Sequence, residues 1–251
     1  MPARVVAPHP VMMVDRRAHS KAARGAVLAR RALLAHEVRM DADHSTESER
    51  FWEAHYAERG VPTNAPSPRP MLVDLIGEFA RQPGAALELG AGQGGDALWL
   101  ARGGWTVTAA DASTTAARRI EETARAEGLT DRVSAVQADL ARDIPEGSFD
   151  LVFACHFQSP VEIDRDAIIA RASRQVAPGG LLLVIDHASV APWSWDQDME
   201  FPSPEQTLEA FALTGDWDRL VVEPRRRTAT APDGASTAEV TDNVLVLRRG
   251  L

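Results

Sequence analysis

Two kinds of hydrophobic pattern alternate along most of the chain. Short, uninterrupted apolar runs are typical of strands buried on both faces, and they are followed by segments whose apolar residues recur every three or four positions, as on one face of a helix. The expected elements are, in order, strand 85–89, helix 96–101, strand 106–110, helix 116–126, strand 133–137, strand 149–154, helix 165–176 and strand 181–185. This βαβ series predicts a doubly wound, largely parallel sheet.

The pattern changes toward the carboxyl end of the chain. A helix is expected over residues 204–213, and two further strands, 219–223 and 243–248, are separated by a polar stretch at 231–236 that contains Gly and Pro. Such a connection indicates an antiparallel hairpin. The expected fold class is therefore α/β: a Rossmann-like, doubly wound, seven-stranded sheet with a C-terminal antiparallel hairpin.

Two helices are expected before the sheet. Ser and Thr at 45–46, followed three residues later by Ser48 or Glu49, form a capping signal that starts an amphipathic helix. Residues 61–70 contain four prolines and indicate a linker. Apolar residues at helical spacing then predict a second helix over 71–79.

The first part of the chain differs in charge from the rest. Residues 1–36 carry seven Lys and Arg residues and one acidic residue. We expect residues 1–44 to be a basic N-terminal extension, helical or disordered, and residues 45–251 to form one domain. An arginine-rich targeting peptide and a translation start at Met40 are alternatives, so the sequence leaves open whether residues 1–39 belong to the mature protein.

The composition argues against several classes of protein. The formal net charge of the 251 residues is -9, which disfavours a protein that binds the phosphate backbone of nucleic acids. Charged residues interrupt every apolar run before it reaches the length of a membrane-spanning helix. Cys155 is the single cysteine, so no disulfide can form within the chain and a reducing, cytoplasmic location is expected.

The candidate chemistry is concentrated in a glycine-rich turn between the first strand of the sheet and the next helix. Gly90, Gly92 and Gly95 satisfy the dinucleotide-binding pattern GxGxxG. Glu88 with Gly90, Gly92 and Gly94 also satisfies an acidic-x-GxGxG pattern. A carboxylate at Glu88 would repel a pyrophosphate but not a cationic amino-acid ligand, so electrostatics favour the second pattern.

Two more acidic residues follow the next strands. Asp111 ends the second strand, where a carboxylate can accept hydrogen bonds from both hydroxyls of a ribose. Asp139 follows the third strand, where it can accept from an adenine amino group while Leu140 covers the ring. Purely structural roles stay open: Glu88 could bind a neighbouring backbone amide, and Asp139 could cap the turn that follows it.

These motifs, in this order, resemble the class I S-adenosylmethionine-dependent methyltransferases. The resemblance extends over about residues 51–248 and rests on the glycine turn, Asp111, Asp139-Leu140, Phe149-Asp150-Leu151-Val152 and Pro178-Gly179-Gly180-Leu181. The stretch Phe51-Trp52-Glu53-x-x-Tyr56 is also similar to the first helix of small-molecule members related to the thiopurine and tellurite-resistance groups.

The resemblance implies a site for S-adenosylmethionine, with S-adenosylhomocysteine as the product. The implied cofactor contacts are Glu88, Gly90, Ala91, Gly92, Gly94, Asp111, Ala112, Asp139, Leu140 and Cys155. The implied activity is methyl transfer to oxygen, nitrogen, sulfur or carbon of a small metabolite, with no nucleic-acid or membrane partner. An NAD-dependent oxidoreductase and a non-catalytic module that binds S-adenosylmethionine are the alternatives. The methyl acceptor and the oligomeric state stay open.

Two histidines lie just beyond strand carboxyl ends, where functional residues gather in open α/β sheets. His156 follows the fourth strand and His187 follows the fifth. A neutral imidazole can remove a proton from a hydroxyl or amine, so both are candidate catalytic bases, and Asp186 could orient either of them. The alternative is a histidine that only forms hydrogen bonds within a loop.

The connection after His187 is rich in aromatic residues. Trp193 and Trp195, together with Tyr56 and Phe157, are the expected walls of a pocket for an apolar or flat acceptor. The alternative is that these rings only bury the loop against the sheet.

Motifs for metals and for nucleic acids are missing from the sequence. The seven histidines show no close pairing at helical spacing, so no metal site is expected. Residues 156–160 do not match the Asx/Ser-Pro-Pro-aromatic signature of nucleic-acid amino methylases. The basic run Arg225-Arg226-Arg227 is expected to be a solvated strand edge without a function.

Overall fold

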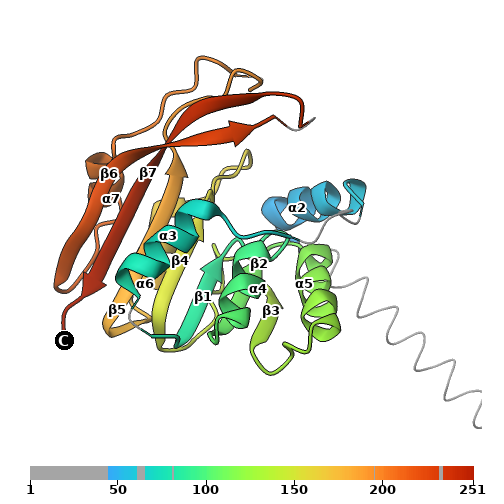
Figure 1. The fold of residues 1–251 in the computed structure, drawn as a ribbon, viewed down its shortest axis with the longest axis vertical. Helices are drawn as coiled ribbons and strands as arrows, with labels where there is room; N and C mark the ends of the chain where they lie inside the picture. Colours follow the sequence, from blue (N-terminus) through green and yellow to red (C-terminus); the bar gives the residue numbers. More distant parts are fainter. Residues whose placement is uncertain (1–44, 61–65, 81, 195, 232–233) are drawn as a thin grey trace, which may run out of the picture. The chain divides into compact units, whose positions relative to one another are not determined.

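A seven-stranded sheet forms the centre of the computed structural model (Figure 1). The structure describes residues 45–60, 66–80, 82–194, 196–231 and 234–251, so the expected extension over 1–44 lies outside the described residues. The strands are β1 Ala85–Leu89, β2 Thr106–Asp111, β3 Val133–Gln137, β4 Phe149–Cys155, β5 Val176–His187, β6 Trp217–Thr230 and β7 Thr237–Arg249.

The order of the strands is β3-β2-β1-β4-β5-β7-β6. Strands β1 to β5 run parallel to their neighbours among themselves, and β7 is antiparallel to both β5 and β6. The expected fold class is confirmed. Because the parallel strands all end at the same edge of the sheet, the loops that follow β1, β2, β3, β4 and β5 come together there.

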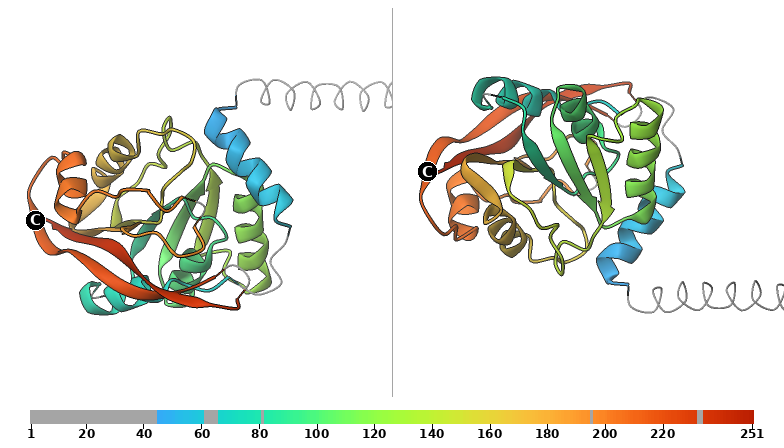
Figure 2. Two further views of the ribbon diagram at one scale, coloured as in Figure 1. Left: turned by 90° about the horizontal axis from the view of Figure 1, so that it is seen from above. Right: turned by 90° about the horizontal axis from the view of Figure 1, so that it is seen from below.

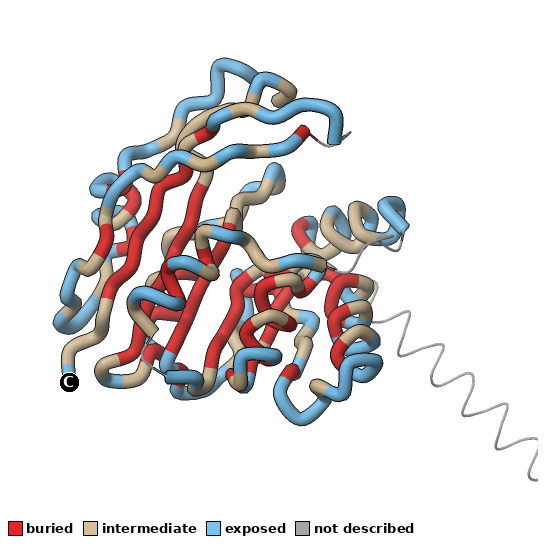
Figure 3. Tube along the Cα trace, in the orientation of Figure 1, coloured by how far each residue is buried: buried red, intermediate tan, exposed pale blue. Residues whose placement is uncertain are grey.

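Helices cover both faces of this sheet (Figure 2). They are α2 Glu47–Glu58, α3 Pro70–Phe79, α4 Gly95–Arg102, α5 Thr114–Ala126, α6 Arg165–Ser173 and α7 Pro204–Ala210. Leu75, Leu98 and Ile120 of α3, α4 and α5 pack into one core, whereas Ile169 of α6 and Phe211 after α7 pack into a second. The central strands are buried between the two cores (Figure 3). Among the described helices, none has the length and apolar character needed to cross a membrane.

The starts of several helices follow from local sequence. The hydroxyl of Thr46 accepts from the backbone N–H of Glu49 at 3.1 Å, and the Glu49 carboxylate accepts from the backbone N–H of Thr46 at 2.6 Å. This is the capping box expected before α2. Ser203 and Gln206 form a second box at α7. Pro70 starts α3, where its missing N–H has no helical partner to lose.

Helix α6 ends, and strand β5 begins, at an earlier residue than the apolar pattern predicts. α6 ends at Ser173, not at 176, and β5 begins at Val176, not at 181. Val176 pairs with Phe149 before a shift in the register between β4 and β5. Residues 176–180 contain Pro178 and two glycines and form no apolar run, so the pattern did not show that β5 begins before them.

The C-terminal hairpin is longer than expected. The hydrophobic pattern predicted 219–223 and 243–248, but β6 and β7 extend to Thr230 and Thr237 at the turn. The added residues pair with each other beyond His187, where β5 ends. Most of them are exposed or half-buried, so they lack the apolar run on which the prediction relied.

Candidate functional site

The glycine turn after β1 lies at the carboxyl edge of the sheet. Gly90, Gly92 and Gly94 have positive φ angles of 72°, 58° and 78°, which side chains other than glycine rarely adopt. A Cβ on Gly92 would lie 2.9 Å from the hydroxyl oxygen of Tyr56, and a Cβ on Gly90 would lie 2.5 Å from a ring carbon of Phe157. Both the backbone conformation and the two rings packed on the turn therefore require glycine.

A cavity of about 350 Å³ opens beside this turn. The expected cofactor contacts that line it are Gly90, Ala91, Gly92, Asp111, Ala112, Asp139, Leu140 and Cys155. Glu88 and Gly94 are placed differently from the expectation. Glu88 is buried behind the turn, and Gly94 precedes α4 with the side chain of Ile120 packed against it. The structure thus brings most of the expected contacts to one cavity.

Acidic side chains gather behind the turn around one guanidinium group. Glu88 is 1% exposed, and its Oε2 has no hydrogen-bond partner among the described residues. Burial, and then the charge of Asp96, raise the pKa of Glu88 well above its ordinary value, while a hydrogen bond from the Ala97 backbone opposes this shift. Asp96 accepts hydrogen bonds from the backbone N–H and the guanidinium of Arg69. This pair ties the segment before α3 to the start of α4.

Asp111 and Asp139 lie at the ends of β2 and β3, as expected. Asp111 Oδ2 accepts from the backbone N–H of Gly92 at 2.8 Å, and Oδ1 accepts from that of Ser113 at 2.9 Å. Burial raises the pKa of Asp111, and these two hydrogen bonds oppose the shift. Asp139 accepts from the backbone N–H of Ala141 at 3.0 Å, so it caps its turn and also lines the cavity. Each carboxylate oxygen keeps a lone pair for a ligand.

Hydrogen bonds to Glu53 hold helix α2 beside this cavity. The Glu53 carboxylate accepts from the Ser113 hydroxyl at 2.7 Å, and from the backbone N–H and hydroxyl of Thr115 at 2.9 Å and 2.6 Å. The attachment joins α2 to the start of α5 and sets Trp52 and Tyr56 in the cavity wall. No separate role was predicted for Glu53, although it belongs to the Phe-Trp-Glu-x-x-Tyr stretch.

A larger cavity of about 1030 Å³ adjoins the first. The residues that line both are Trp52, Arg59, Gln158, Ser159 and Ile163. The connection after β5 contributes Trp193, Met199 and Phe201 to its wall, in line with the expected acceptor pocket. Trp195 lies outside the described residues.

Tyr56 and Phe157, expected in the acceptor pocket, line the smaller cavity instead. Successive helical residues point about 100° apart. Phe51 and His55 of α2 consequently face the larger cavity, while Tyr56 reaches the glycine turn at Gly92. The direction of each side chain around the helix therefore decides which of the two cavities a residue of α2 lines.

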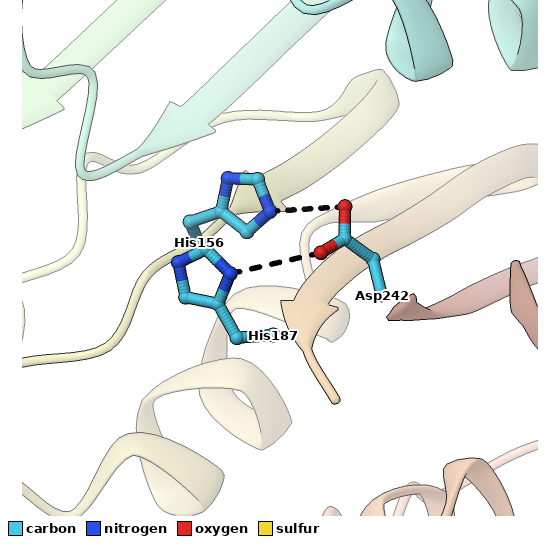
Figure 4. A group of neighbouring side chains, drawn as sticks. All are labelled: His156, His187 and Asp242. Atoms are coloured by element: carbon cyan, nitrogen blue, oxygen red, sulfur yellow. Dashed lines mark ion pairs between the residues drawn. The ribbon is translucent and has the colours of Figure 1, made fainter. Parts of the chain in front are cut away.

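Three side chains from different strands meet near the boundary of the two cavities (Figure 4). His156 follows β4, His187 ends β5, and Asp242 lies opposite His187 in the register of β5 with β7. His156 Nε2 is 3.3 Å from Asp242 Oδ2, and His187 Nδ1 is 3.6 Å from Asp242 Oδ1. The two imidazole rings are stacked, with centroids 4.0 Å apart and planes 9° apart.

Asp242 is also paired with an arginine. Arg227 Nε donates to Asp242 Oδ2 at 2.5 Å, and Arg227 Nη2 donates to Oδ1 at 3.3 Å. Burial by itself would raise the pKa of Asp242, but its contacts with His156, His187 and Arg227 outweigh burial and hold the pKa far below its ordinary value. The expectation that 225–227 is only a solvated edge is therefore wrong for Arg227.

Asp186, expected to orient one of the histidines, is bound elsewhere. Both of its carboxylate oxygens accept from Arg165 Nη2, at 2.6 Å and 2.5 Å. Successive side chains of a strand point to opposite faces, so Asp186 and His187 diverge. The carboxylate beside the histidines comes from Asp242 of β7 instead.

The cluster of His156, His187 and Asp242 also bears on the expectation that the chain has no metal site. Sequence spacing showed no pair of histidines on one helix, yet candidate ligand atoms of His156, His187 and Asp242 lie within 4.8 Å of one another. Spacing along a single element cannot detect ligands that three separate strands contribute.

The substitution His156→Asn should reduce the loss of stability on acidification. Burial lowers the pKa of His156 to about 4, against an opposing contact with Asp242, whereas an imidazole in an unfolded chain titrates near about 6.5. Between these values the unfolded chain binds a proton that the folded chain does not. The free energy of unfolding therefore falls as the pH falls, by up to roughly 3 kcal/mol.

Asparagine suits this position because His156 has a positive φ of 56°, which asparagine tolerates. Urea unfolding at about pH 7 and about pH 4.5 would measure the free energy of unfolding of both proteins. The comparison concerns the pH dependence alone, so a uniform change in stability does not affect it. An equally steep pH dependence in the variant would contradict the prediction.

Comparison with known proteins places this site in a family. Residues 86–180 match the family described as "Methyltransferase domain". The chain is 38% identical over 104 residues to "Methyltransferase GfsG" of Streptomyces halstedii, covering 40% of this chain and 36% of that protein. It is 30% identical over 133 residues to "Ribosomal RNA small subunit methyltransferase C" of Alcanivorax borkumensis, covering 51% of this chain and 40% of that protein. Residues 86–180 of this chain therefore carry a methyltransferase domain.

Solved structures show the same fold as this chain. A structure described as "Conversion of a Disulfide Bond into a Thioacetal Group during Echinomycin Biosynthesis" has a TM-score of 0.63 at 23% identity and covers 80% of this chain and 93% of its own. TehB from Haemophilus influenzae has a TM-score of 0.58 at 19% identity and covers 79% and 67%. The chain spans two fifths or less of the length of the two curated relatives, so their activities are not assigned to it.

The residues of the smaller cavity fit S-adenosylmethionine, the cofactor of this family. The glycine turn presents backbone without a Cβ, and Asp111 has lone pairs available for ribose hydroxyls. The buried carboxyl groups of Glu88 and Asp96 lie behind the turn with Arg69 already paired. A cationic sulfonium nearby would favour the ionised form of Glu88, whose pKa burial raises, whereas the pyrophosphate of NAD would oppose it, so the oxidoreductase alternative is not favoured.

Four residues around the two cavities were not predicted as functional from the sequence: Glu53, Arg69, Arg227 and Asp242. The one sequence feature that could have drawn attention to Arg227 is the basic run on a predicted strand. Asp242 precedes an apolar run and belongs to no motif that would indicate a functional site. Arg69 lies in the proline-rich linker. Their contacts join elements that are far apart in the chain, and no local spacing reveals such contacts.

Proposed function

We propose that this protein transfers the methyl group of S-adenosylmethionine to oxygen, nitrogen, sulfur or carbon of a small metabolite. The observation that carries the proposal is the junction of two cavities: one beside the glycine turn and a larger one that shares part of its wall. Methyl transfer is an in-line displacement, and it requires the acceptor to lie next to the sulfonium. Two adjoining cavities meet that requirement.

The larger cavity favours a flat or apolar acceptor. Trp193, Met199 and Phe201 line it, and aromatic walls bury apolar ligand surface. One relative is a ribosomal RNA methyltransferase by name. The net charge of -9 argues against an RNA acceptor here, because RNA binding needs a basic surface.

The chain's own residues would bind, align and shield the reactants. The glycine turn and Asp111 would hold the nucleoside, Asp139 and Leu140 would hold the adenine, and α2 would cover the cavity and exclude water. The bound cofactor supplies a methyl group on a positively charged sulfur. His156 and His187 would be the candidate bases for an acceptor that must lose a proton.

We also propose that residues 45–251 act as one catalytic domain and that residues 1–44 are an extension to it. The buried thiol of the single Cys155 fits a reducing compartment, for which the cytoplasm is our proposal.

Incubation with methyl-labelled S-adenosylmethionine and a metabolite extract tests the proposed function. We expect the label in a small molecule, and calorimetry should show S-adenosylhomocysteine binding with a Kd of about micromolar order. Binding without any transfer would indicate a non-catalytic binding module instead. Binding of NAD without binding of S-adenosylhomocysteine would indicate an oxidoreductase.

A further inference from the structure

The two stacked histidines line different cavities. His156 lies in the wall of the smaller cavity, which fits the cofactor, and His187 lies in the wall of the larger one. The side chain of His156 is 17% exposed, whereas that of His187 is 43% exposed. An acceptor in the larger cavity would therefore meet the ring of His187.

His156 Nδ1 accepts a hydrogen bond, whereas Nε2 is buried 3.3 Å from Asp242 Oδ2 without hydrogen-bond geometry. Arg69 Nε donates to His156 Nδ1 at 3.3 Å. Because a guanidinium can only donate, Nδ1 is the accepting nitrogen and the proton of the neutral ring resides on Nε2, which faces Asp242 Oδ2. Burial lowers the pKa of this ring to about 4, so it resists protonation. His156 is consequently a poor acceptor for a substrate proton.

His187 has one nitrogen free for a substrate. Its Nδ1 faces Asp242 Oδ1 at 3.6 Å, and its second nitrogen, Nε2, points away from that carboxylate (Figure 4). In the described part of the chain, the His187 ring lies beside Asp242 and stacks on the His156 ring. Its backbone N–H is bound separately, by Gln158 Oε1 at 3.2 Å.

Asp242 favours one tautomer of His187. Its side chain is 1% exposed and accepts two hydrogen bonds from Arg227. These contacts, with those of the two histidines, hold its pKa far below the ordinary value, so the carboxylate remains ionised. An ionised carboxylate beside Nδ1 favours the proton on that nitrogen and leaves the lone pair on Nε2. The same charge stabilises the imidazolium that forms when Nε2 takes up a proton.

We propose that His187 is the general base of the methyl transfer, that Asp242 is its positioning residue, and that the acceptor carries a hydroxyl or a protonated amine. This inference rests on the proposed function. The acceptor's O–H or N–H bond breaks and its proton passes to His187 Nε2. The electron pair left on the acceptor atom forms the new bond to the methyl carbon, and the C–S bond breaks with its electrons remaining on sulfur. The proton then leaves His187 for water.

The charges around His187 favour this role over metal binding, although the cluster resembles a ligand set. Facing it are Asp242 of β7, the neutral ring of His156, and beyond them the guanidinium groups of Arg227 and Arg69. Asp186 on the neighbouring position is neutralised by its pair with Arg165. Two guanidinium groups oppose a further cation, and His156 Nε2 carries a proton where a metal would need a lone pair.

The test compares variants in the labelling assay, with the metabolite extract that the wild-type protein methylates as the acceptor probe. His187→Ala should lower the rate by about a hundredfold or more while leaving the affinity for S-adenosylhomocysteine within about threefold. Added imidazole should restore part of the rate, because it replaces the missing base. Asp242→Asn should lower the rate by at least about tenfold. The matched control Glu127→Gln changes an exposed carboxylate paired with Arg102, far from both cavities, and should leave the rate unchanged.

Nitrogen-15 NMR of labelled histidines supplies a readout that needs no acceptor. We expect His187 protonated at Nδ1 and His156 at Nε2, and in Asp242→Asn the His187 signals should change. A His187→Ala variant that keeps its rate, a loss that imidazole does not repair, or reversed tautomers would overturn the inference. So would activity that a chelator abolishes and zinc or magnesium restores, because the cluster would then be a metal site. A wild-type protein that labels nothing would overturn the proposed function itself, and this role with it.

Discussion

The substitution Asp111→Ala should weaken the binding of S-adenosylhomocysteine by about a hundredfold or more. Hydrogen bonds to a charged group contribute about 1.5–3 kcal/mol each, and a ribose offers two hydroxyls to this carboxylate. Asp111 also accepts hydrogen bonds from the backbone N–H groups of Gly92 and Ser113. The variant would therefore lose its ligand contacts and leave two backbone donors of the binding turn without their partner.

Calorimetry with S-adenosylhomocysteine would measure this effect. Asp150→Ala is a matched control, since Asp150 also accepts a backbone N–H, that of Ala85 at 2.8 Å, but lies near the start of β4. That position is at the opposite end of the strand from the cavity, and we expect an unchanged affinity. If both variants bound as tightly as the wild-type protein, Asp111 would have a purely structural role.

The substitution Gly95→Ala should both destabilise the protein and weaken cofactor binding. A Cβ on Gly95 would lie 2.2 Å from the carbonyl oxygen of Ser67 and 2.8 Å from its carbonyl carbon. Both are backbone atoms, so the segment before α3 must move away from α4. Forcing extra volume into a packed site costs about 1–3 kcal/mol. The movement would also pull Arg69 from Asp96 and distort the wall of the smaller cavity, lowering the affinity by about tenfold or more.

Gly77→Ala provides the control for this prediction. Gly77 lies inside α3, and a Cβ there would meet no atom within 4 Å. Alanine favours a helix interior over glycine by up to about 1 kcal/mol, so this variant should be slightly more stable than the wild-type protein. Denaturant unfolding would compare the two variants. Equal midpoints for Gly95→Ala and Gly77→Ala would show that the contact with Ser67 imposes no strain.

The fold was largely predictable because each element carries its own periodic signal. The apolar runs identified β1 to β4 within about one residue, and the capping box at Thr46 and Glu49 located α2. The hairpin was predicted too short. Its outer half has no apolar run, because hydrogen bonds between β6 and β7 hold it without burial in the core.

The candidate site was predictable where a residue lies at the end of a parallel strand. Asp111, His156 and His187 were all found in this way, since such ends share one edge of the sheet. The partner of the histidines was misassigned to Asp186, which is adjacent in sequence but points to the other side of β5. Asp242 reaches His187 because β7 pairs with β5 in one particular register.

The sequence by itself determined the order of strands and helices, the glycine turn beside the smaller cavity, and the shared edge at which both histidines lie. These features follow from side-chain periodicity within single elements and from the common direction of parallel strands. Only the tertiary structure decided that Asp242 orients the histidines and that Glu53 and Arg69 secure the cofactor cavity. Such contacts depend on strand register and on packing between distant segments, and neither leaves a repeating pattern in the chain.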